Sequence, residues 1–198
     1  MRSVPPDLAD RLVPAARVFA ELGFDDARIE DLTEATGVAS STLYYYFEGK
    51  RDVLAFLLQD FVDRVATAVN AAARAEGDAR TRLERVIRTQ LALMFEQPDT
   101  CRVLLAELGR IGRLPDIAKA VNEAFHDPVK ALLTQGANDG SLRDLPVEIA
   151  ASAIYGAVTV TALHYVVADQ PVAADDIAAA ILTVLADGYR PTTSKRRT

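Results

Sequence analysis

Hydroxyl groups and one ammonium group are concentrated in residues 40–50 of this 198-residue chain. The segment opens with two serines and Thr42, continues with three consecutive tyrosines at positions 44–46, and ends with Lys50. Hydroxyl groups form hydrogen bonds with phosphate oxygens and with base edges, and an ammonium group is attracted to a phosphate. These side-chain types therefore indicate contact with a nucleic acid.

Two short helices separated by a glycine turn must position this segment. Residues 30–36 have an amphipathic pattern that Gly37 ends, and residues 40–47 form the second helix. This is the helix-turn-helix pattern, in which the second helix enters the major groove of DNA.

A preceding helix is predicted over residues 7–22, with Gly23 as the residue that ends it. Pro14 predicts either a kink or a helix that begins near Leu12, because a proline inside a helix removes a hydrogen bond. Eight side chains are the predicted core of this first unit: Phe19, Phe24, Ile29, Leu32, Ala35, Val38, Leu43 and Phe47.

The rest of the chain has longer helical patterns and no strand alternation. Helices are predicted over residues 50–74, 79–96, 100–111, 115–138 with an interruption at Pro128, 146–168 and 174–188. The fold class is therefore all-α, with about nine helices in the whole chain.

Composition and charge limit the classes of function. The net charge is −6, and the first 51 residues hold six basic and nine acidic side chains. The sequence has no basic stripe, which is the usual electrostatic mark of a DNA-binding domain, so the DNA interpretation depends on motif and geometry. A single cysteine, Cys101, fits a reducing compartment. Two histidines without metal-binding spacing predict no metal site.

Motifs of known enzymes are missing. The chain has no nucleophile elbow, phosphate-binding loop, dinucleotide fingerprint or zinc-protease motif. We therefore predict that the protein is not an enzyme and uses no cofactor. The N-terminus lacks a basic-then-apolar signal pattern, which predicts a cytoplasmic protein.

Residues 149–168 carry no charged side chain and are long enough to be a transmembrane candidate. The stretch is diluted by alanines and by four polar residues, Ser152, Thr159, Thr161 and His164. We favour a helix that is buried on both faces, one against its own domain and one against a partner subunit. No membrane contact is predicted.

A set of residues at fixed spacing extends the helix-turn-helix pattern over residues 12–55. They are Ala15, Ala16, Phe19, Gly23, Phe24, Ile29, Leu32, Ala35, Gly37, Val38, Thr42, Leu43, Tyr44, Phe47, Lys50 and Leu54. This segment resembles the DNA-binding domain of tetracycline-repressor-like (TetR-family) regulators, and the remainder resembles them in helical architecture and length. The resemblance implies a homodimeric repressor whose C-terminal domain binds a small effector and then releases DNA.

Four positions depart from the family pattern. Ala39 stands where a serine commonly caps the recognition helix, and Ser40, at a position that is often basic, is expected to take over as the cap. Arg28 stands where a small hydroxyl residue often caps the preceding helix, and it is expected to contact a phosphate instead. Pro14 is unusual in the first helix.

Eight side chains are the candidate contacts to a double-stranded DNA operator. Ser40, Ser41 and Tyr45 are assigned to base edges. Lys50 is assigned to a phosphate, aided by the N-terminus of the helix that it begins. The remaining candidates are also assigned to the backbone: Arg28, Thr42, Tyr44, which is alternatively a packing residue, and Tyr46. A dimer would present two recognition helices ~34–36 Å apart, or a multiple of this, and select a palindromic operator.

Given this resemblance, residues 1–51 are predicted as the helix-turn-helix DNA-binding domain. Residues 52–190 are predicted as the effector-binding and dimerisation domain, and residues 191–198 as a disordered tail. The last two helices are expected to form a four-helix bundle with the partner. The interface candidates are Ala150, Ala153, Gly156, Ala157, Ala178 and Ala179.

A cavity for a small, mainly hydrophobic effector is expected between the helices of residues 79–138 and the inner face of residues 149–168. Its polar or polarisable candidates are Gln90, Met94, Cys101, Glu107, Asn122, His126, Tyr155, Thr159 and His164. The alternative is a ligand-independent DNA-binding or protein-interaction dimer. A filled core without any cavity would favour that alternative.

Overall fold

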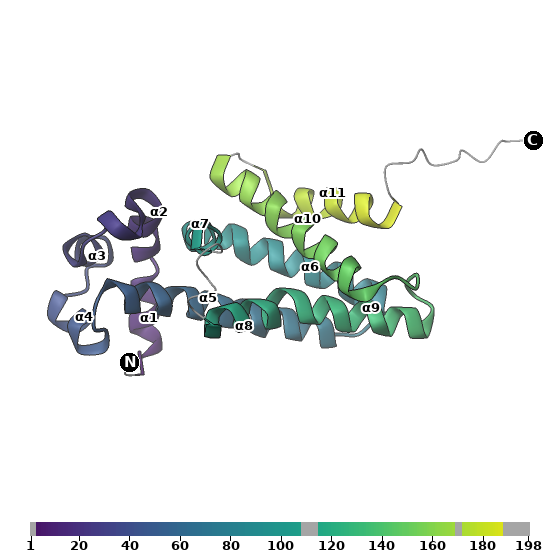
Figure 1. The fold of residues 1–198 in the computed structure, drawn as a ribbon, viewed down its shortest axis with the longest axis horizontal. Coiled ribbons are helices and arrows are strands. Elements are labelled where there is room, and N and C mark those ends of the chain that lie inside the picture. The colour runs from purple at the N-terminus through teal and green to yellow at the C-terminus, as the bar shows by residue number, and fades with distance from the viewer. Residues whose placement is uncertain (1–2, 108–114, 169–171, 188–198) are drawn as a thin grey trace, which may run out of the picture.

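The computed structural model describes residues 3–107, 115–168 and 172–187, and these residues form an all-α fold, as predicted (Figure 1). Four helices lie together at one end: α1 (Pro6–Leu12), α2 (Ala15–Asp26), α3 (Ile29–Thr36) and α4 (Ser40–Tyr46). The predicted boundary between residues 51 and 52 falls in the first turn of the next helix and remains a prediction. The predicted tail, residues 191–198, lies outside the described residues.

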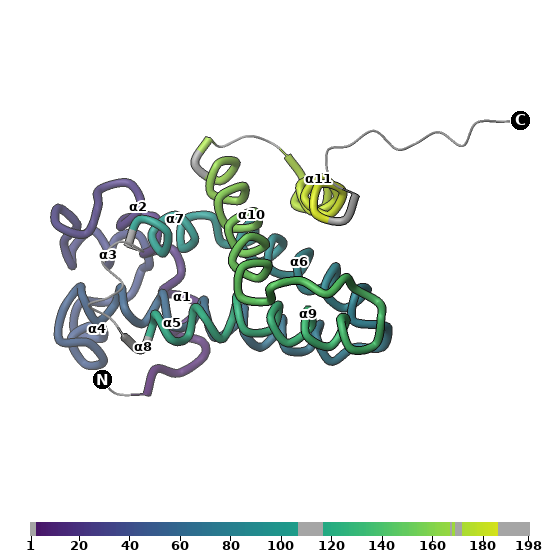
Figure 2. The backbone as a smooth tube through the Cα atoms, turned by 45° about the vertical axis from the view of Figure 1, so that its right-hand side comes forward, coloured from purple at the N-terminus to yellow at the C-terminus, as the bar shows by residue number. Residues whose placement is uncertain are grey.

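The long helix α5 (Lys50–Arg74) begins among these four helices and runs into the second group. That group comprises α6 (Ala79–Glu96), α7 (Pro98–Glu107), α8 (Pro115–Val121), the π-helical turn η2 (Asn122–His126), α9 (Asp127–Asp139), α10 (Val147–Ala168) and α11 (Ala174–Asp187). Helix α5 packs against α6 and η2, α10 crosses α6, α7 and α9, and α11 packs on α6 and α10 (Figure 2). Helix α7 packs against α2, so α5 and α7 both join the two groups.

The predicted first helix is divided at Pro14. Helix α1 ends at Leu12, and α2 begins directly after the proline, because Pro14 lacks the N–H that would continue the ladder. Gly23 interrupts α2 with φ 78° and ψ 164°, a conformation that side chains with a Cβ avoid, so the predicted glycine break is confirmed.

The core of the N-terminal unit matches the prediction except at one position. Phe19, Leu32, Val38, Leu43 and Phe47 are buried, and the other two large apolar candidates pack against them partly buried. Ala35 is exposed, so its assignment to the core was wrong. Its helix is only eight residues long, and the buried face of so short an element is narrow.

Pro128 explains the interruption of the predicted helix over residues 115–138. It lies in the first turn of α9, after η2, and has no N–H to donate to the carbonyl of Ala124, four residues earlier. The buried side chain of Gln90 on α6 compensates, since its Nε2 donates to the carbonyls of Ala124 at 3.4 Å and Phe125 at 3.2 Å. Gln90 therefore satisfies the carbonyl of Ala124, which the proline leaves without its helical donor, and also donates to the carbonyl of Phe125.

Candidate nucleic-acid interface and internal cavity

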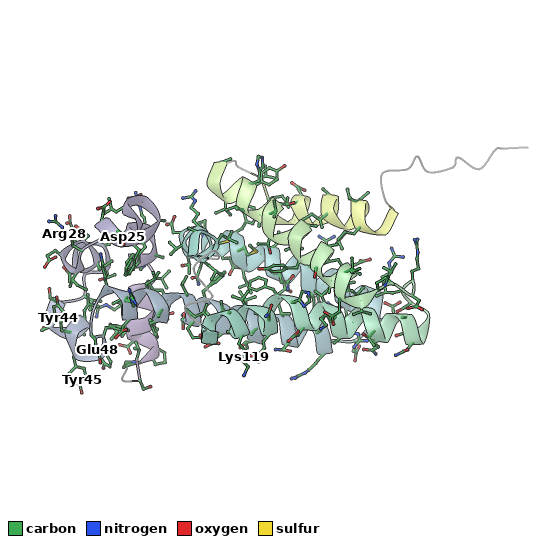
Figure 3. The ribbon with its side chains drawn as sticks, in the orientation of Figure 1. Asp25, Arg28, Tyr44, Tyr45, Glu48 and Lys119 are labelled. Atoms are coloured by element: carbon green, nitrogen blue, oxygen red, sulfur yellow. The ribbon has the colours of Figure 1, made fainter. Side chains whose placement is uncertain are left out.

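Helix α4 presents one face to the core and the opposite face to solvent. Leu43 and Phe47 are buried, four residues apart on the inner side. Tyr44 and Tyr45 are each 59% exposed, and Figure 3 shows both pointing away from the body of the molecule, as does Arg28. Ser40 and Ser41 are exposed as well, while Thr42 is half-buried. The candidates for DNA contact therefore gather at the N-terminal end of the molecule.

The tyrosines of α4 support one another. The rings of Tyr45 and Tyr46 meet edge to face with centroids 4.9 Å apart, and Tyr46 lies 6.4 Å from the ring of Phe47. Edge-to-face pairs are favourable because the positive ring edge meets the negative ring face. Half-buried Tyr46 thus links the exposed Tyr45 ring to the core, and Tyr46 is less available to DNA than Tyr44.

No side chain caps the N-terminus of α4. The N-cap is Ala39, with extended dihedral angles, and Ser40 is the first helical residue rather than a replacement cap. The expectation that Ser40 takes over the cap was therefore wrong, because a residue with helical dihedral angles is in the wrong position to accept from its own first turn. Helix amides without an internal acceptor are suited to a phosphate oxygen.

Lys50 has a role that the sequence did not predict. Its Nζ donates to the carbonyls of Asp25 and Ala27, both at 2.8 Å, and lies 4.9 Å from the centroid of the Phe24 ring. The ammonium therefore fastens the first turn of α5 to the turn between α2 and α3. An ammonium has three N–H donors, so one is left for a phosphate.

Arg28 is the N-cap residue of α3, and it is exposed. Its backbone N–H donates to Oδ2 of Asp31 at 2.8 Å. Asp31 therefore supplies a carboxylate inside the first turn, where the helix dipole favours negative charge, and the Arg28 side chain remains on the outer surface.

A small cavity lies between α5, α6, α7, α8, η2 and α10, and we call it the central cavity. Its lining consists of Phe61, Met94, Cys101, Leu104, Leu105, Val121, Phe125, Tyr155 and Thr159. It encloses about 10 Å³, which is too little for more than one water molecule. The central cavity is therefore closed in this structure, and any ligand must separate its walls.

The central cavity has three groups with polar atoms. Thr159 is 7% exposed, and its Oγ1 is buried without a well-formed hydrogen bond in the described part of the chain. Burial raises the pKa of Tyr155, and the neighbouring Thr159 hydroxyl offsets part of this rise. Burial also raises the pKa of the Cys101 thiol to about 12, so the thiol is neutral and a weak nucleophile at physiological pH.

Comparison with known proteins identifies the family. Residues 12–56 match the family model for bacterial regulatory proteins of the tetR family, and residues 76–189 match that of the tetracyclin repressor-like C-terminal domain. The chain belongs to the TetR family. It is therefore a DNA-binding transcription regulator and not an enzyme, as predicted.

Individual relatives of this TetR-family regulator are distant but cover nearly the whole chain. The fatty acid metabolism regulator protein of Bacillus subtilis is 24% identical over 192 residues, which span 95% of this chain and 98% of that protein. The transcriptional repressor KstR2 of Rhodococcus jostii is 26% identical and covers 88% of this chain and 86% of its own length. The structure of the regulator FadR from Bacillus subtilis in complex with stearoyl-CoA has a TM-score of 0.75 at 22% identity, covering 91% of this chain and 99% of that one.

Four of the nine predicted effector contacts of this TetR-family regulator line the central cavity: Met94, Cys101, Tyr155 and Thr159. The others do not. Gln90 holds η2, and His126 Nε2 lies 3.3 Å from Ser152 Oγ on α10, which makes it another link between helices. Asn122 and His164 are exposed, and the side chain of Glu107 lies outside the described residues.

The predicted interface residues on α10 and α11 differ in how exposed they are within their own chain. Ala153 and Ala179 are exposed, and Ala150, Gly156 and Ala157 are half-buried. Ala178 is fully buried in its own chain, so its assignment to a subunit interface was wrong.

Among the described residues, the segment Val147–Val166 has the length and composition of a membrane span, and 33% of it is buried. Its large exposed apolar residues are Ile149 and Val160, and Val184 is exposed on α11.

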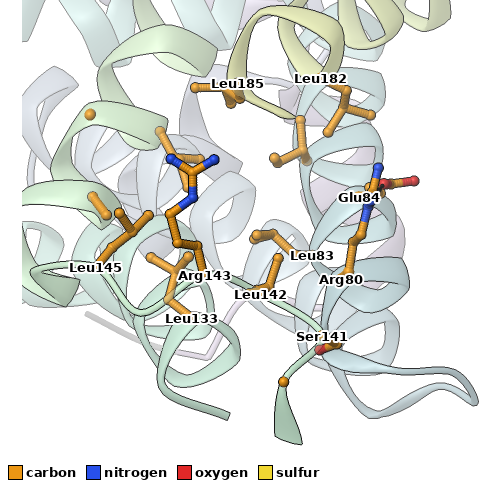
Figure 4. Close-up of a pocket in the computed structure, with 15 residues that line it drawn as sticks. Arg80, Leu83, Glu84, Leu133, Ser141, Leu142, Arg143, Leu145, Leu182 and Leu185 are labelled. Atoms are coloured by element: carbon orange, nitrogen blue, oxygen red, sulfur yellow. Dashed lines mark hydrogen bonds and ion pairs between the residues drawn. The ribbon is translucent and has the colours of Figure 1, made fainter. Parts of the chain in front are cut away.

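A larger hollow, which no predicted effector contact lines, lies at the end of the molecule opposite α4. This distal groove has a volume of about 620 Å³, within the ~300–1,000 Å³ range of small-molecule sites. It lies between α6, α9, α10, α11 and the loop that joins α9 to α10 (Figure 4). The sequence carries no motif for it, because its lining comes from separate helices and a loop that only the tertiary fold brings together.

Proposed function

We propose that the protein is a homodimeric cytoplasmic repressor that leaves a palindromic operator when a hydrophobic acyl thioester binds its central cavity. The observation that carries the proposal is the convergence of Met94, Cys101, Tyr155 and Thr159 on one apolar cavity whose walls include α5 and α7, the two helices that reach the DNA-binding end. The domain division at residues 51 and 52 belongs to the same proposal.

The outer face of α4 would read the operator. Ser40, Ser41 and Tyr45 would contact base edges, and exposure of all three supports this assignment. Arg28, Thr42, Tyr44, Tyr46 and the remaining N–H of Lys50 would contact phosphates. Few cationic side chains take part, so the salt dependence of binding should be shallow.

The subunit interface would consist of the outer faces of α10 and α11. Ile149 is 71% exposed, Val160 65% and Val184 60%, and burial of such side chains is favourable by about 1.5–3 kcal/mol each. The small residues Ala153 and Ala179 would let the helices of two copies approach closely. A symmetric dimer would then place two copies of α4 at a spacing set by the turn of the DNA helix.

The central cavity and one relative support an acyl thioester as the effector. The lining is almost entirely apolar, which suits an alkyl chain, and the buried Thr159 hydroxyl is suited to donate to a carbonyl oxygen. The related FadR structure holds stearoyl-CoA. An acyl thioester combines these two features, an alkyl chain and a carbonyl group.

Opening of the closed cavity would transmit the signal along two paths. Phe61 lies on α5, about 16 Å along the helix from Lys50, whose ammonium holds the α2–α3 turn. Leu104 and Leu105 lie on α7, which packs against α2. A ligand that displaces these side chains would move both helices and change the position of α4. Allosteric coupling is usually about 1–3 kcal/mol.

The ligand-independent regulator is the second candidate. The closed cavity favours it, because a volume of about 10 Å³ is nearly a filled core. The two candidates differ in one respect, namely whether a ligand changes the affinity for DNA.

Selection of bound DNA from a random pool at fixed salt tests the operator proposal. A palindromic consensus is expected, and the absence of any enriched sequence would refute the proposal. The selected operator complex is then titrated with stearoyl-CoA, with CoA alone as the control. Release by stearoyl-CoA only, weakened about tenfold in Thr159→Val by loss of one hydrogen bond, is expected. DNA affinity that no acyl-CoA changes would favour the ligand-independent regulator.

A further inference from the structure

The walls of the distal groove are apolar and its rim is charged. Leucine and isoleucine side chains from α6, α9, α10, α11 and the α9–α10 loop form the walls: Leu83, Ile87, Leu133, Leu142, Leu145, Ile154, Leu182 and Leu185. Arg80 and Glu84 lie on the α6 side, and Arg143 comes from the loop on the other side (Figure 4). The groove is therefore shaped for a ligand with an apolar body and a charged end.

The loop that forms one side of the groove is anchored to α9. The N–H of Leu142 donates to the carbonyl of Gly136 at 3.0 Å, and a Cβ at position 136 would lie 2.5 Å from Leu142 Cδ1. The Ser141 hydroxyl and the Ser141 N–H, which donates to Asp139 Oδ1 at 2.9 Å, together lower the pKa of the Asp139 carboxyl group. Since Ser141 and Arg143 flank the packed Leu142, their backbone positions are set before any ligand arrives. The groove is preformed, unlike the central cavity.

The charge of the groove favours an anion. Two arginines and one glutamate line it, a local charge of +1 in a protein whose net charge is −6. Arg80 Nε donates to Glu84 Oε1 at 3.1 Å, whereas Arg143 has no ion pair or hydrogen bond within the described residues. An unpaired guanidinium can donate to a carboxylate or a phosphate.

We infer that the distal groove is a second ligand site, which binds an amphipathic organic anion with its apolar body along the leucines and its anionic group near Arg143. The site is separate from the central cavity, because Ala150, Ala153 and Ile154 of α10 face the groove whereas Tyr155 and Thr159 face the cavity. The inference goes beyond the proposed effector response and does not depend on it. A second copy of the chain is the competing occupant, since Ala150 and Ala153 are also candidates for the subunit interface.

Calorimetric titration of the full-length protein with decanoate and with decyltrimethylammonium tests the charge preference. The two probes share an alkyl chain and differ in the sign of the head group. Decanoate is expected to bind about tenfold more tightly, because its carboxylate is attracted to the two arginines of the rim, which repel the ammonium group. Equal affinity of the two probes, or no binding of decanoate, would overturn the inference.

Variants locate the site. The pair Arg80→Gln and Arg143→Gln should weaken decanoate about tenfold and should not weaken the ammonium probe, since Glu84 then remains as the charged residue of the rim. Arg85→Gln is the control, since this arginine is on the same helix but donates to the carbonyl of Glu76 away from the groove. Decanoate binding that survives the paired variant but is lost in Thr159→Val would place the ligand in the central cavity and overturn the inference.

The dependence of decanoate affinity on protein concentration distinguishes an organic anion from a second copy of the chain as the occupant of the groove. A decanoate affinity that falls as the subunits associate would show that a second copy fills the groove, which also overturns the inference. If acyl thioesters do not release the protein from its operator, only the effector proposal is refuted. The second-site inference is unaffected, because decanoate binding is measured without DNA.

Discussion

Replacement of Lys50 by methionine is the sharpest test of how the DNA-binding end is held to the rest of the molecule. Methionine keeps an unbranched apolar stem beside Phe24 but removes the ammonium. The variant therefore loses the hydrogen bonds to the carbonyls of Asp25 and Ala27, together with the contact between the cation and the Phe24 ring. Both the stability of the fold and the position of α4 should suffer.

The expected cost follows from these contacts. A hydrogen bond from a charged donor contributes ~1.5–3 kcal/mol, and partial exposure reduces each of these two to about 1 kcal/mol. The cation–π contact adds roughly 0.5 kcal/mol. A total of about 2.5 kcal/mol corresponds to a decrease in melting temperature of about 5–10 °C for a chain of this size.

Thermal unfolding followed by circular dichroism measures this change, with Lys119→Met as the control. Lys119 is 76% exposed and, among the described side chains, pairs with Glu123 at 3.6 Å, so its loss should cost less than about 0.5 kcal/mol. If Lys50 acted solely on a phosphate, the melting temperature would not change, and only the salt slope of operator binding would fall, by about 1. A K50M melting temperature equal to that of the wild type would refute the fastening role.

Three further predictions concern glycines and the buried thiol. Gly23→Ala, at φ 78° and ψ 164°, should lower the free energy of unfolding in urea by ~2 kcal/mol. Gly49→Ala, at the extended φ of 174°, should cost less than about 0.5 kcal/mol, and equal losses would contradict the strain argument. Burial raises the pKa of Cys101 from 9.0 to about 12, so the unfolded chain ionises first, and the stabilisation present below pH 9 is lost toward pH 12. Urea unfolding at about pH 8 and about pH 10 should show a decrease that Cys101→Ala lessens, and an unchanged decrease would exclude this thiol. Gly136→Ala should destabilise the fold by ~1–3 kcal/mol through its clash with Leu142, and added Leu142→Ala should recover most of the loss. Failure to recover would refute the packing of that loop.

Local chemistry made much of the fold predictable. The bounds of α5 and α6 agree with the sequence pattern because apolar residues recur every three to four positions, and Gly77 and Asp78 interrupt them. A kink at Pro14 was one of the two predicted outcomes, the other being a helix that begins near Leu12. The effect is predictable because the N–H that a proline lacks would bond within the same turn of helix. The π-helical turn before Pro128 was predicted only as an interruption, since its form depends on Gln90 from another helix.

Side-chain roles that depend on a distant partner were not predictable. Helix α10 is apolar on every side, so its sequence does not distinguish the wall of a cavity from an outer face, and His164 was placed inward although it is exposed. Ala178 was placed on the outside although it is buried. Alanine patterns carry little information about direction, because a methyl group is compatible with either environment.

The amino-acid sequence by itself determined the helices, the helix-turn-helix and the family, because periodicity, proline, glycine and the fixed spacing of residues 12–55 are all local properties of the chain. The tertiary structure alone decided that Lys50 holds the α2–α3 turn, that the central cavity is closed, and that two arginines flank the distal groove. Each of these features joins residues more than twenty positions apart. Their energies arise from packing and charge across helices, which no short stretch of sequence contains.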